Sequence, residues 1–245
     1  MLAVWAEQLL TDSSHRNNFT NITSAVMFLD NSSPKLKQFD MTIFAELPKL
    51  RTLSLSHGQG QVDDIVTHKP LMIEQLDLSY NNLKFFPATC SVEFGNFSKE
   101  RHSLFPKLKI LKLNFNRLRS LGMNGVRDAK PCLPNLTSLQ LIGNYITDIN
   151  AMFFKGFPKL MYLKLEHQRR IQDKIVAYNL NLPENFLGPK AFSQTVLVTP
   201  RLKVLYLNGN SIDFKQAVRK DIFSNCKNVQ ILDVSQNIFR QVRHR

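Results

Sequence analysis

Basic side chains are the groups in this chain that could most clearly bind a ligand, because the chain has 32 lysines and arginines and only 19 acidic residues. The formal net charge is +13 at pH 7, and the sequence pI is near 9.8. Guanidinium and ammonium groups bind phosphate, sulfate and carboxylate, so this balance favours an acidic ligand or a nucleic acid. The alternative is that these charges are solvated and keep the protein soluble. A ligand site requires that the cations gather on one surface, whereas solvated charges do not. Where the cations lie depends on the secondary-structure elements to which they belong.

The sequence contains no convergent set of residues for catalysis or metal binding. Its histidines fall at unrelated spacings, and it has no glycine-rich phosphate loop, metal-ligand spacing or nucleophile elbow. We therefore predict that the chain is not an enzyme and that it uses no metal and no cofactor. The six histidines are His15, His57, His68, His102, His167 and His244.

A repeated frame of apolar residues and asparagine organises most of the chain. Its clearest copy, residues 108–118, reads L-x-x-L-x-L-x-x-N-x-L, and we number frame positions from its first leucine. Strand side chains alternate, so positions 4 and 6 point into a core while positions 2, 3, 5, 7 and 8 face solvent. Stacked frames predict a parallel sheet along the inside of a solenoid. The frames begin at Thr23, Leu50, Ile73, Leu108, Leu136, Leu160, Leu202 and Val229. The first frame is weak, and two others have Gly58 and Gln168 at position 9.

Position 9 of the frame is a clear asparagine in five copies. An asparagine amide donates and accepts hydrogen bonds at once, so a column of them can satisfy backbone groups where the chain turns out of each strand. We predict a structural asparagine ladder formed by Asn81, Asn116, Asn144, Asn210 and Asn237.

A column of phenylalanines precedes the strands, since residues 44–50 match residues 154–160 position for position, and these rings would stack as a convex spine. The frame is the leucine-rich-repeat signature. With such a spine the chain resembles extracellular leucine-rich-repeat proteins, and Toll-like receptor ectodomains most of all. The resemblance implies an α/β solenoid, a leucine-rich-repeat horseshoe with a parallel β-sheet on the concave face and loops or short helices on the convex side. It also implies an innate immune receptor that forms dimers, on the extracellular face of the plasma membrane or in the endosomal lumen.

The array predicts one domain, because each repeat packs against its neighbours around a continuous core. We assign residues 1–22 to an N-terminal flank and residues 23–245 to about eight repeats, with insertions near 87–105 and 166–200. Each insertion is either a projecting loop that contacts a partner or a tolerated one without a role; residues 180–187 mimic half a frame. The sequence ends inside a frame, so we expect the last repeat to be truncated, and we find no stretch long and apolar enough to predict a membrane span. We therefore expect a fragment of a longer receptor, or a secreted protein.

Cysteines and glycosylation motifs bear on the compartment. Cys90 and Cys132 lie on the return segments of adjacent repeats. Neighbouring coils of a solenoid are about 5 Å apart, within the reach of a disulfide, so the two cysteines either form one or remain two separate thiols. Toll-like receptors also carry cysteines in insertions of this kind. Cys226 replaces an apolar core residue, which predicts a buried thiol. Asn-X-Ser/Thr motifs predict glycans at Asn18, Asn21, Asn96 and Asn135. A fifth motif, at Asn31, falls on the asparagine column, so we expect no glycan there.

The frame also sorts the charges between two surfaces. The solvent-facing positions 2, 3, 5, 7 and 8 carry five cations and five anions, which predicts a charge-neutral concave face. Positions 10–13, named here the flank, carry seven cations and two anions. Toll-like receptors commonly bind ligands on this flank, and we predict that its ligand-binding residues are Lys84, Arg117, Arg119, Arg169 and Arg170. The alternative set, whose rings would anchor a partner on the concave face, is Tyr80, Lys112, Phe115, Tyr162, Lys164 and Tyr206.

The main functional hypothesis is the ligand-recognition ectodomain of a Toll-like innate immune receptor, binding a microbial, acidic or nucleic-acid ligand on the basic flank. The alternative is a secreted or cell-surface adhesion module that binds a protein on its concave face, and a third is a remnant with the fold and no partner. Flank binding predicts steep salt dependence. Concave binding predicts mild salt dependence and greater sensitivity to changes at Tyr162, Lys164 and Tyr206.

Overall fold

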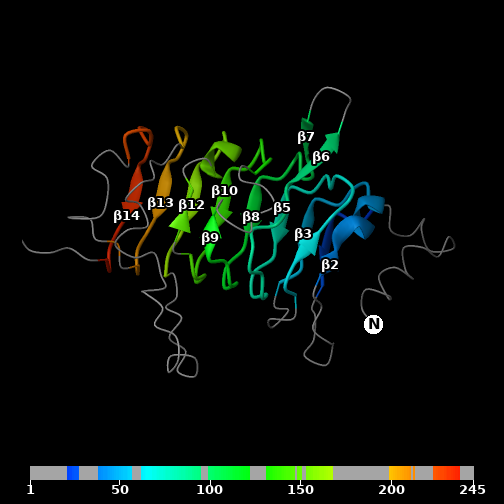
Figure 1. Cartoon of the computed structure of the whole chain (residues 1–245), viewed down its shortest axis with the longest axis horizontal. Coiled ribbons are helices and arrows are strands. Elements are labelled where there is room, and N and C mark those ends of the chain that lie inside the picture. The colour runs from blue at the N-terminus through cyan, green and yellow to red at the C-terminus, as the bar shows by residue number, and fades with distance from the viewer. Residues whose placement is uncertain are drawn as a thin grey trace, which may run out of the picture.

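A parallel sheet of eight short strands runs along the described part of the chain (Figure 1). The computed structural model describes residues 21–27, 38–56, 62–94, 99–121, 131–146, 148–150, 153–167, 199–210, 212 and 223–237. The strands lie in the sheet in chain order, each followed by a return segment, which is the leucine-rich-repeat solenoid that the frame predicts. They are β1 (Ser24–Val26), β3 (Thr52–Ser54), β5 (Gln75–Asp77), β8 (Ile110–Lys112), β10 (Ser138–Gln140), β12 (Tyr162–Lys164), β13 (Val204–Tyr206) and β14 (Ile231–Asp233).

Equal frame positions pair across every strand boundary. Leu111, at position 4 of its frame, lies opposite Leu76 on one side and Leu139 on the other. The strands occupy positions 3–5 of their frames, so each position forms a column that crosses the sheet.

The same pairing corrects the first frame by one residue. Ser24 pairs with Thr52, which is at position 3, so the frame begins at Ile22 and not at Thr23. Ile22, Ala25 and Met27 pack against the core, whereas Val26, expected inside, is exposed. Position 9 then moves to Asp30, outside the described residues. In this numbering Asn31 is no longer at position 9, and Asp30 and Lys35 are no longer at positions counted for the concave face and the flank; all three lie outside the described residues.

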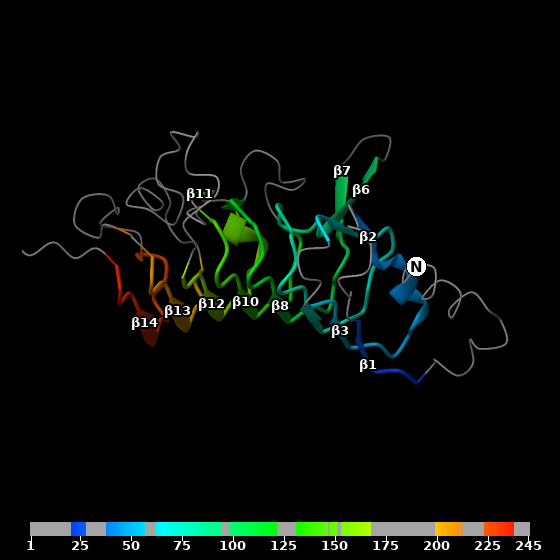
Figure 2. The ribbon, with the colours of Figure 1, turned by 90° about the horizontal axis from the view of Figure 1, so that it is seen from below.

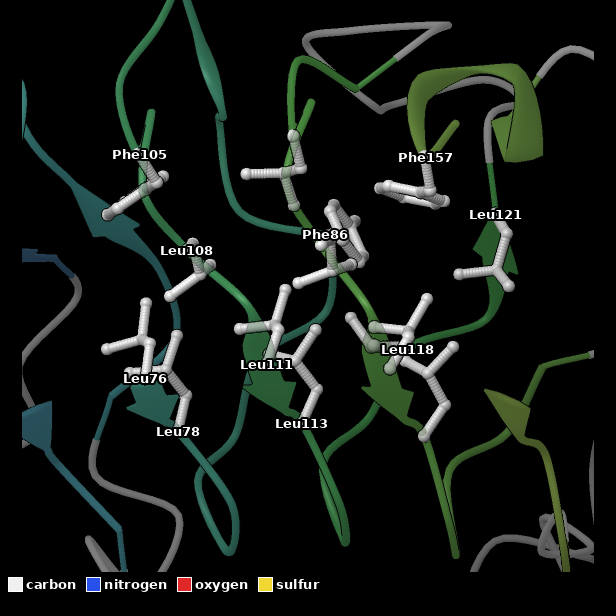
Figure 3. Packing of buried hydrophobic residues seen from close by; sticks show 14 of the residues in the cluster. Leu76, Leu78, Phe86, Phe105, Leu108, Leu111, Leu113, Leu118, Leu121 and Phe157 are labelled. Atoms are coloured by element: carbon white, nitrogen blue, oxygen red, sulfur yellow. The ribbon is translucent and has the colours of Figure 1, made fainter. Parts of the chain in front are cut away.

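The leucines at positions 1, 4 and 6 form the core (Figure 3). In the frame that begins at Leu108, all three are at most 1% exposed, as they are in the frame that begins at Leu136. Each such leucine contributes roughly 1.5–3 kcal/mol through its burial. Leu232 on β14 is 45% exposed, because β14 is the last strand of the sheet and has a neighbouring strand on one side.

Short elements form the convex side, opposite the sheet (Figure 2). Aromatic rings pack there between the repeats. Phe153, Phe154 and Phe157 contact one another edge to face, with ring centroids 5.2–6.4 Å apart, and Phe86 packs on them from the preceding repeats. These contacts form the spine between repeats. The convex elements are the 3₁₀ helices η2 (Met41–Glu46) and η3 (Phe153–Gly156), the pair β2 (Phe39–Asp40) and β4 (Ile65–Val66), and the pair β9 (Ser120–Leu121) and β11 (Asp148–Ile149).

The insertion near residues 87–105 forms an antiparallel hairpin that projects from the solenoid (Figures 1 and 2). Its strands are β6 (Cys90–Phe94) and β7 (Lys99–Ser103). At its base Cys90 forms a disulfide with Cys132 of the next repeat, with a Cα–Cα distance of 5.3 Å, so the structure has the bridge and not two free thiols. The second insertion, including residues 180–187, lies outside the described residues apart from its ends.

Cys226 is a buried free thiol, as its place in the frame predicts. Burial raises its pKa, and the hydroxyl of Thr199 lies 3.3 Å from its sulfur. Within the described ranges, no helix is long and apolar enough to cross a membrane, and no three His, Cys, Asp or Glu side chains are grouped to hold a metal ion.

The asparagines at position 9, four of them buried and Asn237 half-buried, connect consecutive repeats through their side-chain amides. Asn144 Nδ2 donates to the carbonyl oxygens of Leu141 in its own repeat and Leu113 in the preceding one, both at 2.9 Å. Its Oδ1 accepts from the backbone N–H of Leu118 at 3.2 Å. The same bonds to two repeats are made by Asn81, Asn116, Asn210 and Asn237. The amides therefore form a polar seam in two stretches, from Asn81 to Asn144 and from Asn210 to Asn237, separated by the repeat with Gln168 at position 9.

Replacing Asn144 with alanine leaves buried backbone groups of two repeats without partners. We expect a loss of roughly 2–4 kcal/mol in the free energy of unfolding, because each unsatisfied buried group costs about 1–3 kcal/mol. Urea unfolding followed by circular dichroism measures this loss. The matched control is Asn228→Ala, which removes an exposed asparagine with a bond to Pro200 O. Equal effects of the two substitutions would show that the seam has no special role.

Candidate functional site

The solvent face of the parallel sheet differs between its two halves. The columns at positions 3 and 5 alternate with the buried leucines, so their side chains leave the core and form this face. On the N-terminal strands these residues are mostly small or polar, whereas β12, β13 and β14 carry large apolar side chains. Position 3 holds Ser24, Thr52, Gln75, Ile110, Ser138, Tyr162, Val204 and Ile231; position 5 holds Val26, Ser54, Asp77, Lys112, Gln140, Lys164, Tyr206 and Asp233.

Cations in the N-terminal half of this face are paired with carboxylates of the neighbouring strand. Lys109 Nζ lies 2.7 Å from Glu74 Oε2, and Lys112 Nζ lies 3.4 Å from Asp77 Oδ2. The hydrogen bond and charge of Lys109 lower the pKa of Glu74. Because Lys112 has this partner, it is less available to a ligand than the sequence alone suggests.

The C-terminal half presents an apolar row to solvent. Tyr162, Val204 and Ile231 lie opposite one another on adjacent strands, and Tyr162 and Ile231 are 43% and 49% exposed. Beside this row, Lys164 Nζ lies 5.1 Å from the centre of the Tyr206 ring, in a cation–π contact. The structure thus brings Tyr162, Lys164 and Tyr206 together, as the concave hypothesis requires.

Val204 and Ile231 were missing from the sequence-based set. That set was chosen from charges and aromatic rings, so aliphatic residues at exposed frame positions were not considered. Their signal was nevertheless present, because both occupy position 3, which faces solvent in every frame.

Position 8 adopts a left-handed backbone in six successive repeats. The φ angles are 48–68° at Tyr80, Phe115, Gly143, His167, Gly209 and Gln236. The chain turns out of each strand at this position, and glycine is the residue that adopts such angles without strain. Two of the six are glycine. The ring at position 8 of the preceding repeat lies over each of these two glycines.

Tyr80 and Phe115 form a stack along this column and do not join the apolar row. Their rings are 4.6 Å apart and nearly parallel. The Phe115 ring also lies over Gly143, where an added Cβ would be 2.6 Å from Phe115 Cδ1. Phe115 is half-buried and packs between repeats, so its ring is less available to a partner than that of Tyr162. Two strands, β8 and β10, separate Tyr80 from Tyr162.

The flank is only partly described. Arg117 and Arg119 are exposed on it, whereas Lys84 forms an ion pair with Asp63 at 3.2 Å. Arg169 and Arg170 lie outside the described residues.

The glycosylation candidates also differ from one another. Asn21 is exposed, whereas Asn135 is half-buried and donates through Nδ2 to Pro106 O at 2.7 Å. The nitrogen of Asn135 to which a glycan would be attached is therefore already hydrogen-bonded in the folded chain. Asn18 and Asn96 lie outside the described residues.

Comparisons with known proteins show that the chain is similar to extracellular leucine-rich-repeat proteins. It is 27% identical to bovine osteomodulin over 76% of this chain and 46% of the relative. It is 26% identical to human lumican over 85% and 62%, respectively. It is 23% identical to zebrafish transforming growth factor beta activator LRRC33, over 94% of this chain and 32% of the relative. The chain therefore spans less than two thirds of the length of these relatives.

No family model matches the chain. The relatives support the repeat class and an extracellular location, but they do not single out Toll-like receptors, so that part of the resemblance is not supported.

Substituting Gly143 with alanine tests the packing of position 8. The new Cβ would meet the Phe115 ring, and the left-handed backbone costs about 1–2 kcal/mol for a residue with a side chain. We expect Gly143→Ala to be destabilising and part of the loss to disappear in the Phe115→Ala background, with a coupling energy of at least about 1 kcal/mol. A double-mutant cycle of urea unfolding measures it. Additive effects would mean that the ring does not rest on this glycine.

Replacing Lys109 with methionine tests the paired half of the sheet. The pKa of Glu74 should rise toward its usual range, because the hydrogen bond and charge of Lys109 lower it. A carboxyl with a lowered folded-state pKa stabilises the fold above its unfolded-state pKa, and this contribution disappears as the pH falls through the folded-state pKa. The stability difference between wild type and variant should therefore shrink on acidification. NMR titration of the Glu74 carboxyl is the direct measurement, with Lys203→Met as the control; an unchanged pKa in Lys109→Met would contradict the pairing.

Proposed function

We propose that this chain is a ligand-binding part of an extracellular leucine-rich-repeat protein and that it binds a protein on the C-terminal half of its concave face. The observation that supports this most strongly is the apolar row of Tyr162, Val204 and Ile231 with the Lys164–Tyr206 contact beside it. Large rings exposed on a rigid sheet lose little conformational entropy when a partner covers them. Tyrosine is also among the residues that contribute most to binding energy at protein interfaces.

The two halves of the sheet support a division of roles. Paired carboxylates and lysines on β5 and β8 satisfy one another, so a partner gains little by displacing them. On β12 and β13, Lys164 contacts a ring instead, and a carboxylate of a partner could approach it. A protein segment with an apolar anchor next to an acidic residue fits this half best.

The relatives are compatible with a protein ligand. One of them is named as an activator of transforming growth factor beta, which is itself a protein. For this chain the ligand is proposed as a class, a secreted or cell-surface protein, and not as that factor.

A second proposal is the pattern-recognition ectodomain of a Toll-like receptor that binds a microbial, acidic or nucleic-acid ligand on the flank and dimerises in the full-length protein. The exposed side chains of Arg117 and Arg119 support it. This function would place the protein on the plasma membrane or in the endosomal lumen. The pairing of Lys84 with Asp63 reduces the charge available there.

Selection of a random peptide display library on the immobilised chain distinguishes the two surfaces. We expect most selected peptides to lose at least tenfold in affinity, equal to about 1.4 kcal/mol, on Tyr162→Ala and on Tyr206→Ala, because both rings contribute to the exposed face. Binding should depend only weakly on salt.

Phe85→Ala provides the matched control, because Phe85 is a 48% exposed ring outside the sheet. Selected peptides that bind the Tyr162→Ala/Tyr206→Ala double variant normally but are lost on Arg117→Glu/Arg119→Glu would overturn the concave proposal in favour of the flank.

A further inference from the structure

A column of cations occupies the edge of the sheet at which the strands begin, which we name the start edge. It comprises position 2 of each frame and the two residues before position 1, numbered 0 and −1. The pairing of equal positions makes these residues neighbours across the repeats. Among described residues they include eight cations, Lys49, Arg51, Lys107, Lys109, Lys159, Arg201, Lys203 and Lys227, and one carboxylate, Glu74.

The start edge therefore has a net charge of +7, more than half of the +13 of the whole chain. The start edge precedes the strands and the flank follows them, so the two lie at opposite ends of the strands. Its single carboxylate belongs to the N-terminal half, where Lys109, Arg51 and Lys107 all lower the pKa of Glu74. In the described part of the chain, no ion pair neutralises Lys159, Arg201, Lys203 or Lys227. The cations near β12, β13 and β14 therefore carry a charge of +4, and the four cations near β3 and β8 with Glu74 carry +3.

Asparagine amides hold some of these cations in place without neutralising them. Lys159 Nζ donates to Asn135 Oδ1 at 2.6 Å, and Lys49 Nζ donates to Asn21 Oδ1 at 2.6 Å, in each case across a repeat boundary. Asn135 is itself fixed by its bond to Pro106 O. An amide oxygen is neutral, so the ammonium group is positioned and keeps its full charge.

Strand spacing converts the column into a linear array. Neighbouring strands are about 4.8 Å apart, so the stretch from β8 to β14 extends over roughly 19 Å, with no cation at these positions in the β10 repeat. A ligand that matches it must repeat negative charge along its own length. A single phosphate or carboxylate would engage one or two of these cations and gain little in water.

We propose that the start edge binds a linear sulfated polysaccharide. Lysines are suited to sulfate as point charges, and Arg201 can bind it bidentately. The extracellular relatives and the Cys90–Cys132 disulfide indicate the compartment in which sulfated polysaccharides are abundant linear polyanions. This surface is separate from the apolar row, so the polysaccharide and a protein ligand can bind to the same chain.

The test is binding of the full chain to immobilised heparin, with hyaluronan as the unsulfated polyanion and single-stranded DNA as the phosphate polyanion. Lys107→Glu/Lys159→Glu/Arg201→Glu should reduce heparin affinity at least about tenfold, because three counterion-releasing contacts are lost. The matched control, Arg117→Glu/Arg119→Glu/Lys155→Glu, makes the same change of charge at three exposed cations away from the start edge and should leave most of the affinity. Wild-type binding should weaken steeply with salt, and hyaluronan should bind weakly.

Lys107→Gln/Lys159→Gln/Arg201→Gln keeps hydrogen-bond donors at the three positions and guards against loss of folding, which circular dichroism monitors. It should also weaken heparin binding. Equal losses in the start-edge and control variants would overturn the proposal, since binding would then follow net charge alone. DNA or hyaluronan binding as tightly as heparin would overturn the assignment to a sulfated polysaccharide. Peptides selected on the concave face should bind these variants normally, so the two proposals can fail independently.

Discussion

The pairing of equal frame positions across every strand boundary is the constraint on which the rest of the structure depends. Parallel backbone hydrogen bonds place position 3 opposite position 3 throughout the sheet, so every residue type that recurs in the sequence becomes a column in space. Leucine columns form the core, and the asparagine column satisfies the backbone beneath it. A slip of one residue would exchange the buried and exposed faces. The leucines and asparagines thus oppose such a slip together.

The two proposed surfaces follow from the same constraint, because each consists of residues at equal positions of successive frames. Tyr162, Val204 and Ile231 form a continuous row only because three different repeats present position 3 in register. The cations of the start edge form an array for the same reason. The apolar row occupies position 3, whereas Lys107, Lys159 and Arg201 of the start edge occupy position 0, three residues earlier in each frame, so these two sets of residues remain distinct although Lys203 at position 2 adjoins Val204. Such a division allows one short domain to contact two kinds of partner.

Sequence periodicity was sufficient to predict the solenoid, the asparagine ladder and the buried Cys226, because each depends on spacing alone. The first frame was misplaced by one residue, since Asn31 resembled a ladder asparagine and residues 22–27 are weakly apolar in both registers. Backbone pairing with β3 decides between the registers. Side-chain partners were also beyond the sequence: the stacking of Phe115 over Gly143 and the pairing of Lys84 with Asp63 depend on how neighbouring repeats approach.

Disulfide trapping between engineered cysteines tests the register most directly, in a Cys226→Ser background that leaves the native bridge intact. Equal positions on adjacent strands have Cα atoms about 4.8 Å apart, within the range that a disulfide needs. The account predicts rapid oxidation of Ser24→Cys/Thr52→Cys and of Thr52→Cys/Gln75→Cys, which join paired residues. It predicts slow oxidation of Thr52→Cys/Asp77→Cys, which lie on the same face two residues out of register. Faster bridging of the mismatched pair would contradict the equal-position pairing and, with it, both proposed surfaces.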